Sequence, residues 1–213
     1  PVSEPEVPDE YRNMDSDEPR VVIAGMGRMG QIVARILRAQ RVPFVALDTE
    51  IASIELQRSI GNMPIFYGDP LRPEILRAAQ VGKAEFMVVA SDDPDTNFKV
   101  VELVRTLYPH VKVIARARNR YNVHRLIDLK AQVVRETFFS SLEMSRLTLI
   151  GLGLSEEQAS SRVRRFQRHD EEVLAAQQKV HGDKAALMQT AREARAELET
   201  LFDSDAIEPN GLK

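Results

Sequence analysis

Short apolar segments rich in β-branched residues alternate with longer segments of helical periodicity between Arg20 and about Val134. Polar positions interrupt the apolar segments little, which is typical of strands that are covered on both faces. The pattern predicts six strands: Val21–Ala24, Phe44–Leu47, Ile65–Tyr67, Phe86–Ala90, Lys112–Ala115 and Gln132–Val134. The segments between them predict five helices: Met29–Gln40, Ile51–Ile60, Pro73–Ala79, Asp95–Leu107 and Arg120–Leu129.

Strands and helices that alternate in this way predict an α/β fold with a Rossmann-like, doubly wound parallel six-stranded sheet in the order 3-2-1-4-5-6. After the sheet the pattern changes. Glu136–Leu152 predicts an apolar helix, and the capping box from Ser155 to Gln158 begins a new helical region. From there to about Phe202 the chain is charged and Ala-rich, broken at Gly182. This C-terminal helical extension has too little apolar surface for a core of its own and must lie on another surface.

The first 19 residues are acidic and contain few apolar side chains. They hold seven carboxylates against Arg12 alone, a net charge of −6, together with four prolines. Such a segment buries too little surface to offset its ordering entropy, so it predicts a disordered linker. A linker at the start of a chain that begins with Pro1 favours a fragment of a longer protein.

Composition excludes several classes of site. Because the chain has no cysteine, it contains no disulfide and no thiolate ligand or nucleophile. Its four histidines show no metal-ligand spacing, which argues against a metal site. The residues after the linker carry a net charge of +3, too little to indicate nucleic-acid binding. No apolar run approaches the roughly 18 residues that a membrane helix needs.

The motif Gly25-x-Gly27-x-x-Gly30 follows the first predicted strand and opens a predicted helix. This context indicates a nucleotide-binding turn, in which the first glycine permits the turn, the second admits the phosphate and the third lets the helix pack closely. Arg28 and Met29 lie within the turn. The alternative is a closely packed turn that has lost its ligand.

Asp48 ends the second predicted strand, 18 residues after Gly30, where a carboxylate that binds both ribose hydroxyls is expected. A carboxylate there disfavours NADP, because its 2′-phosphate would face a negative charge. Asp48 could instead cap the helix that follows.

Two further loops belong to the same edge of the sheet, Gly68-Asp69-Pro70 and Ser91 to Asn97. Asp69 could contact the adenine, and Asp92 and Asp93 could line the pocket, with one of them capping the next helix. These acids could bind a divalent metal, but a solvated helix cap explains them without one. The predicted nucleotide-binding residues are Gly25, Gly27, Arg28, Met29, Gly30, Asp48, Thr49, Gly68, Asp69, Ser91 and Asp92.

No catalytic residue follows from the sequence. A dehydrogenase of this fold needs a substrate domain and an acid/base group near the nicotinamide, and neither is visible. The sequence therefore favours a nucleotide-binding sensor over its main alternative, an NAD-dependent oxidoreductase.

Five segments together carry a family resemblance: Ile23–Gln31, Ala46–Asp48, Phe66–Pro70, Asp92–Asn97 and Val113–Arg118. They closely resemble the RCK/KTN (TrkA-N-like) domain of potassium transport systems. With Arg135–Phe138 and the helix that follows, the chain is more narrowly similar to the C-terminal regulatory domain of Kef-type, glutathione-gated potassium efflux systems. The resemblance covers about residues 20–170.

The resemblance implies a cytoplasmic regulatory domain at the inner face of the bacterial inner membrane, attached to a cation:proton antiporter domain of the same polypeptide. It implies a homodimer, a resident adenine nucleotide (AMP or NAD(H)) and glutathione or its adducts as gating ligands near the dimer interface. Since glutathione carries two carboxylates, arginines should bind it. The candidates by motif position are Arg28, Arg116 and Arg125. The same arginines could instead form salt bridges with neighbouring acids.

The expected organisation is a disordered acidic linker (residues 1–19), a Rossmann-type RCK/KTN domain (20–135), a dimer-crossing helix (136–154) and a helical extension with a tail (155–213). The part of the extension from Glu171 to Lys213 could contact a partner subunit, an ancillary oxidoreductase or the linker. A related alternative for the whole chain is a Trk-type potassium-uptake regulator that does not respond to glutathione.

Overall fold

The computed structural model describes residues 6–15 and 18–203. The chain divides into two compact units, Pro1–Val134 and Arg135–Lys213. Two parts of the expected linker, residues 1–5 and 16–17, lie outside the described residues. The expected tail lies outside them from residue 204 onward.

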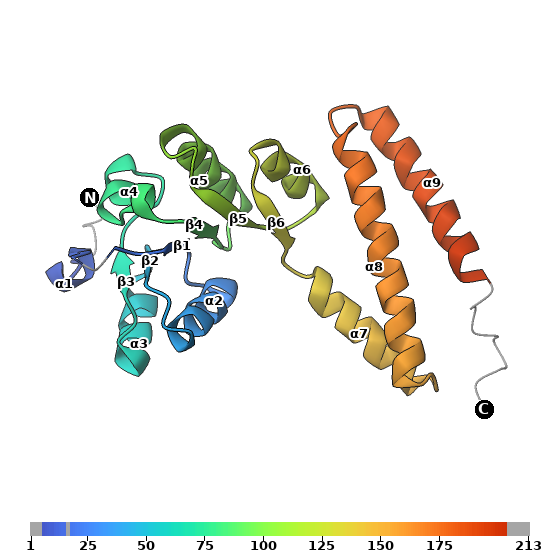
Figure 1. The fold of residues 1–213 in the computed structure, drawn as a ribbon, viewed down its shortest axis with the longest axis horizontal. Helices are drawn as coiled ribbons and strands as arrows, with labels where there is room; N and C mark the ends of the chain where they lie inside the picture. The colour runs from blue at the N-terminus through green and yellow to red at the C-terminus, as the bar shows by residue number, and fades with distance from the viewer. Residues whose placement is uncertain (1–5, 16–17, 204–213) are drawn as a thin grey trace. The chain divides into compact units, whose positions relative to one another are not determined.

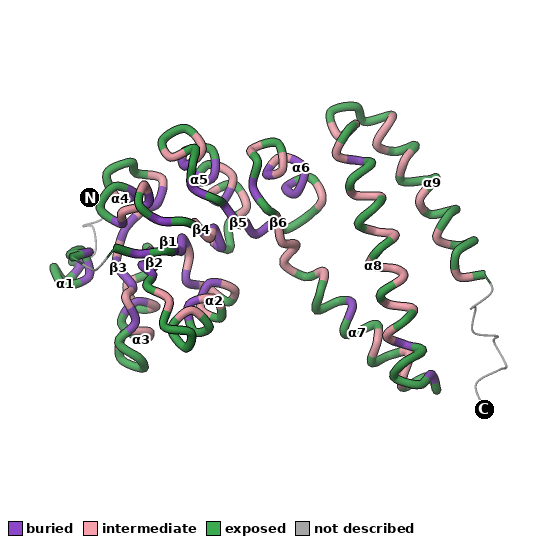
Figure 2. The backbone as a smooth tube through the Cα atoms, viewed as in Figure 1, coloured by how far each residue is buried: buried purple, intermediate pink, exposed green. Residues whose placement is uncertain are grey.

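The first unit is built on a six-stranded parallel sheet, as the sequence predicts, and the strand order β3-β2-β1-β4-β5-β6 is confirmed. The strands are β1 (Val21–Ala24), β2 (Phe44–Asp48), β3 (Ile65–Tyr67), β4 (Phe86–Val89), β5 (Lys112–Ala117) and β6 (Gln132–Arg135). In the centre, Val21 of β1 pairs with Phe44 of β2 and Phe86 of β4. All four residues of β1 are buried, because helices cover both faces of the sheet (Figure 2).

The helices of this unit lie on the two faces of the sheet. They are α2 (Arg28–Ala39), α3 (Ile51–Gly61), α4 (Pro73–Ala78), the 3₁₀ turn η1 (Val81–Lys83), α5 (Pro94–Leu107) and α6 (Arg120–Asp128). In Figure 1, α2 and α3 lie on one side of the sheet and α4, α5 and α6 on the other. The change of face occurs between β1 and β4, where the strand order reverses. A doubly wound sheet binds ligands at such a reversal, beyond the carboxyl ends of the strands.

The prediction of a disordered linker is wrong for residues 7–14. A short helix, α1 (Asp9–Arg12), forms there, and Val7, Tyr11 and Met14 are buried. Tyr11 lies on the helix and Val7 and Met14 flank it, while the carboxylates of Glu6, Asp9, Glu10 and Asp15 are exposed. The guanidinium of Arg58 lies 4.7 Å from the Tyr11 ring and also donates to the Glu10 carbonyl oxygen at 3.2 Å. The acidic composition of the segment gave no indication that these three apolar side chains are buried.

The second unit contains three helices among the described residues: α7 (Phe138–Gly151), α8 (Glu156–Gln178) and α9 (Lys184–Phe202). The predicted capping box is confirmed, since the Ser155 hydroxyl accepts from the Gln158 N–H and the Gln158 side chain accepts from the Ser155 N–H. Arg135 and Asp170 form a mostly buried ion pair at 2.6 Å. Over residues 6–15 and 18–203, no helix combines the length and apolar composition that a membrane span requires.

Candidate functional site

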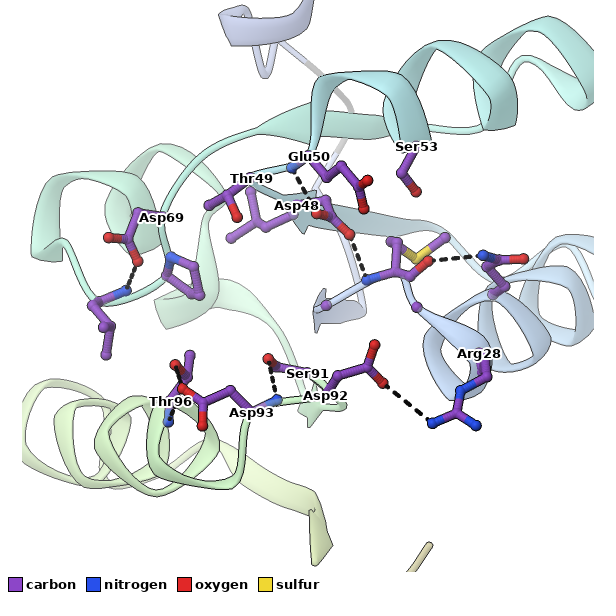
Figure 3. A pocket seen from close by; sticks show the side chains of 17 residues that line it. Arg28, Asp48, Thr49, Glu50, Ser53, Asp69, Ser91, Asp92, Asp93 and Thr96 are labelled. Atoms are coloured by element: carbon purple, nitrogen blue, oxygen red, sulfur yellow. Dashed lines mark hydrogen bonds and ion pairs between the residues drawn. The ribbon is translucent and has the colours of Figure 1, made fainter. Parts of the chain in front are cut away.

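A pocket of about 650 Å³ opens beyond the carboxyl ends of β1 to β4 (Figure 3). Its volume is within the range of small-molecule sites. The lining residues are Gly25, Met26, Gly27, Arg28, Gln31, Leu47, Asp48, Thr49, Glu50, Ser53, Asp69, Pro70, Leu71, Ser91, Asp92, Asp93 and Thr96. Four loops that are distant in sequence therefore form one site, because parallel strands end at the same edge.

The glycine turn between β1 and α2 requires its glycines for different reasons. Gly25 has φ of +98°, which other residues rarely adopt. A Cβ on Gly30 would lie 1.9 Å from the Gly25 carbonyl oxygen, so α2 packs against the turn without room for a methyl group. Gly27 is the N-cap of α2, and no side chain provides the cap hydrogen bond. The first turn of α2 thus presents N–H groups and partial positive charge to the pocket.

Asp48 holds the glycine turn to the end of β2. One carboxylate oxygen accepts from the Met26 N–H and the other from the Glu50 N–H, both at 2.9 Å (Figure 3). The N-cap of α3 is Glu50, so Asp48 is not the helix cap that the sequence left open. The carboxylate faces the pocket from the position where a ribose would be bound in this fold.

The loop after β4 is fixed by Asn97, which sequence reasoning missed. Its side-chain oxygen accepts from the Ser91 N–H at 3.0 Å, and its amide donates to the Ser91 carbonyl oxygen at 2.8 Å. Asn97 is buried at 2% exposure on the first turns of α5. No feature of the sequence marks Asn97 as buried beside the loop, so its role becomes visible only with the fold.

Asp93 is the acid of this loop that caps α5, as the sequence allowed. The Thr96 hydroxyl donates to it at 2.6 Å, and the Asp95 and Thr96 N–H groups also donate to it. These hydrogen bonds, that from Thr96 first, hold the pKa of Asp93 below its ordinary value of 3.8.

Replacing Asp93 with alanine is expected to lower the free energy of unfolding at neutral pH by about 1 kcal/mol, because the cap is lost. The lowered pKa means that the folded protein binds a proton on Asp93 less readily than the unfolded chain does. The cap therefore stabilises above the ordinary carboxyl pKa and ceases to do so as the pH falls through the lower folded pKa. Urea unfolding of both proteins across acidic pH would measure this. A difference that is unchanged at the lowest pH would contradict it.

Three arginines surround Asp92. Arg116 donates to its side-chain oxygen at 2.7 Å, Arg118 donates to its carbonyl oxygen at 2.5 Å, and Arg28 lies 4.0 Å away. Arg116 and Arg118 reach the same loop because residues two apart near the end of a strand point to one face. The side chain of Arg116 is only 3% exposed, whereas that of Arg28 is 83% exposed.

Most of the predicted nucleotide-binding residues line the pocket, but three do not. Met29, Gly30 and Gly68 are absent from the lining. A Cβ on Gly68 would come within 2.7 Å of the Ile75 side chain, so this glycine allows α4 to approach the loop. Sequence reasoning missed several lining residues: Met26, Gln31, Leu47, Glu50, Ser53, Pro70, Leu71 and Thr96.

The three arginines proposed for glutathione have different surroundings. Arg28 lines the pocket. Arg116 is buried in β5 and bound to Asp92, which is the salt bridge that the sequence allowed as an alternative. The guanidinium of Arg125 stacks 3.7 Å from the Phe98 ring and 5.2 Å from the Tyr121 ring, and it does not line the pocket.

The pocket is rich in negative charge. Five carboxylates line it, against the single guanidinium of Arg28: Asp48, Glu50, Asp69, Asp92 and Asp93. Within the described residues, no three acidic, histidine or cysteine side chains converge closely enough to hold a metal ion. The lining can donate backbone N–H groups to an anion and accept from hydroxyl and amino groups, a combination that suits a nucleoside with few phosphates.

Comparison with known proteins gives a consistent result. A family model described as the TrkA-N domain matches residues 21–136, and the model of the potassium efflux system KefB C-terminal domain matches residues 140–211. The chain is 34% identical to a Kef C-terminal domain from Shewanella denitrificans that was solved in an AMP-bound form. That alignment covers 75% of this chain and 98% of the other, with a TM-score of 0.69.

Two other solved structures are less similar to this chain in sequence and in fold. The GsuK RCK domain is 28% identical with a TM-score of 0.50, over 56% of this chain and 26% of that one. The TrkA-N domain of the Escherichia coli inner membrane protein ybaL is 22% identical with a TM-score of 0.56, over 62% of this chain and 98% of that one. At that identity the second likeness concerns the fold alone.

Proposed function

Because the chain belongs to the TrkA-N domain family and, within it, to the C-terminal regulatory domains of Kef potassium efflux systems, we propose that it binds an adenine nucleotide in the glycine-turn pocket and regulates potassium efflux through an attached antiporter domain. The observation that supports this proposal most directly is the pocket, which is lined both by the uncapped N-terminus of α2 and by the carboxylate of Asp48. The AMP-bound relative from Shewanella supports the choice of ligand.

Calorimetric titration of the 213-residue chain tests the nucleotide. We expect AMP, ADP and NAD to bind and NADP to bind more weakly, since its 2′-phosphate would meet Asp48. No binding of any adenine nucleotide at millimolar concentration would contradict the proposal. An enzyme of the oxidoreductase class would instead consume NADH when offered small carbonyl substrates, and we expect no consumption.

A second part of the proposal concerns glutathione. Among the three candidate arginines, Arg28 is the most accessible to an anion from solution, because its side chain is 83% exposed and its ion pair with Asp92 is long at 4.0 Å. A carboxylate of glutathione would gain a charge-assisted hydrogen bond there. Titration with glutathione and with a bulky adduct tests this. Failure of both to bind at millimolar concentration would favour a Trk-type regulator without glutathione response.

The proposed active form is a homodimer at the cytoplasmic face of the bacterial inner membrane. Support comes from α7, on which Phe139, Met144 and Leu147 are all more than half exposed. Large apolar side chains at this density on one helix mark an interaction surface. Sedimentation of the chain should give a dimer whose dissociation becomes measurable when Leu147 is replaced with Asp. A monomer at all concentrations would contradict this part. An ancillary oxidoreductase that contacts the extension from Glu171 onward is proposed as a further partner.

A further inference from the structure

We infer that the side chain of Asp92 occupies the place of the ligand phosphate at the glycine turn, and that this acid sets how many charges a bound nucleotide can carry. The inference rests on the proposed nucleotide site and names a residue that selects among its ligands. The expected ligand is an adenine nucleotide with a small phosphate charge.

The first observation is the position of the carboxylate. A Cβ on Gly27 would have both side-chain oxygens of Asp92 as its nearest neighbours, at 3.2 and 3.4 Å, followed by Asp92 Cγ at 3.5 Å. The missing side chain of this glycine is what lets a phosphate approach the backbone in this fold. The space that Gly27 leaves open is thus occupied by an internal anion. A ligand phosphate at the same place must meet it or displace it.

The second observation is what holds the anion there. Arg116 donates to Asp92 Oδ1 at 2.7 Å and also lies 3.4 Å from the Ala90 carbonyl oxygen. The Arg116 side chain is 3% exposed, so its charge is largely removed from water. Loss of an ionic partner is costly for a buried cation. This ion pair with a mostly desolvated cation holds the Asp92 carboxylate against Gly27.

The third observation is that the side chain can move while the backbone stays. Arg118 holds the Asp92 carbonyl oxygen at 2.5 Å, and Asn97 holds Ser91 through two hydrogen bonds. The side chain of Asp92 is nevertheless 61% exposed. A rotation about its side-chain bonds can clear Gly27 without rearranging the loop. If a ligand phosphate displaced the Asp92 side chain in this way, the ion pair between Asp92 and Arg116 would change as well. Binding of the phosphate would then alter the surroundings of Arg116 on β5.

Comparing AMP with adenosine tests the inference. Replacing Asp92 with asparagine keeps the shape and removes the charge, so the affinity for AMP should rise about tenfold while that for adenosine changes less than twofold. The ratio of the two affinities is the readout, because a general effect on the pocket moves both ligands together. ADP should gain at least as much as AMP, since it carries more charge.

The matched control is Glu50→Gln. It removes the same charge from the lining of the same pocket, but Glu50 is not among the nearest neighbours of Gly27. We expect the ratio of AMP to adenosine affinity to change less than twofold. A tenfold change in this control would overturn the inference, since the effect would then be one of overall pocket charge.

Two outcomes separate this inference from the proposed function. If AMP binds to the unaltered chain and Asp92→Asn leaves the affinity ratio unchanged, the inference is overturned and the nucleotide site stands. If neither protein binds any adenine nucleotide, both are overturned. Should the variant fail to fold, a crystal structure of the unaltered chain with AMP decides. A phosphate at the start of α2 while Asp92 remains 2.7 Å from Arg116 and against Gly27 would overturn the inference.

Discussion

Replacing Gly30 with alanine is expected to lower the free energy of unfolding of the first unit by about 3 kcal/mol and to abolish nucleotide binding. The added methyl group would lie 1.9 Å from the Gly25 carbonyl oxygen, a backbone atom that no side-chain rotation can clear. The helix α2 must therefore shift away from β1. That shift also moves the N–H groups of α2 that face the pocket. Urea unfolding and titration with AMP measure the two effects.

Gly61→Ala is the matched control in the same unit. Gly61 is the last residue of α3, and a Cβ there would meet only the Met63 side chain at an ordinary 3.7 Å. We expect its stability to be unchanged or to rise by up to about 1 kcal/mol, because alanine favours a helix. If Gly30→Ala were as stable as this control and still bound AMP, the conclusion that α2 packs against the glycine turn without room for a methyl group would be wrong.

The sequence predicted the parts of the fold that depend on local patterns. The six strands follow from short apolar runs, and the glycine turn follows from three residues within six positions, so both are visible without tertiary information. Strand ends were less accurate. The end of β5 lies at Ala117, two residues beyond the prediction, and the strand includes the buried Arg116.

What the sequence could not show are the pairings between distant segments. Asp92 and Arg116 are 24 positions apart, and nothing in either neighbourhood indicates that one charge neutralises the other. Asn97 looks like an ordinary polar helix residue until Ser91 is placed beside it. The helix α1 was hidden by its acidic setting, because composition averages over a segment whereas burial of Tyr11 depends on one face of it.

Two carboxylates of the pocket already accept hydrogen bonds from the protein itself. Asp48 already accepts two backbone N–H groups, and Asp93 accepts two N–H groups and a hydroxyl. At Asp93 these hydrogen bonds favour the charged form and hold its pKa below the ordinary value. Both side chains are thereby held in place as fixed acceptors, which suits the proposed binding of a nucleotide.

Replacing Asp48 with asparagine is expected to weaken AMP binding about hundredfold, since two charge-assisted hydrogen bonds to ribose hydroxyls are lost. The substitution is not conservative in this setting. Both oxygens of Asp48 accept from backbone N–H groups at 2.9 Å, so an amide must turn its own N–H₂ toward one of these donors. Titration with AMP measures the loss, and thermal unfolding establishes that the variant is folded.

Asp69→Asn is the control for this prediction. Asp69 lines the same pocket, and among residues 6–15 and 18–203 its carboxylate accepts only the Leu71 N–H, at 2.9 Å, so the amide oxygen of asparagine can replace it. AMP affinity should then fall less than about fivefold. Adenosine discriminates further, because it keeps the ribose and lacks the phosphate. Asp48→Asn should weaken adenosine and AMP by the same factor, whereas Asp92→Asn should alter AMP alone. Equal AMP affinities in the unaltered chain and Asp48→Asn would remove Asp48 from the ribose site, and a gain confined to AMP would place Asp48 beside the phosphate instead.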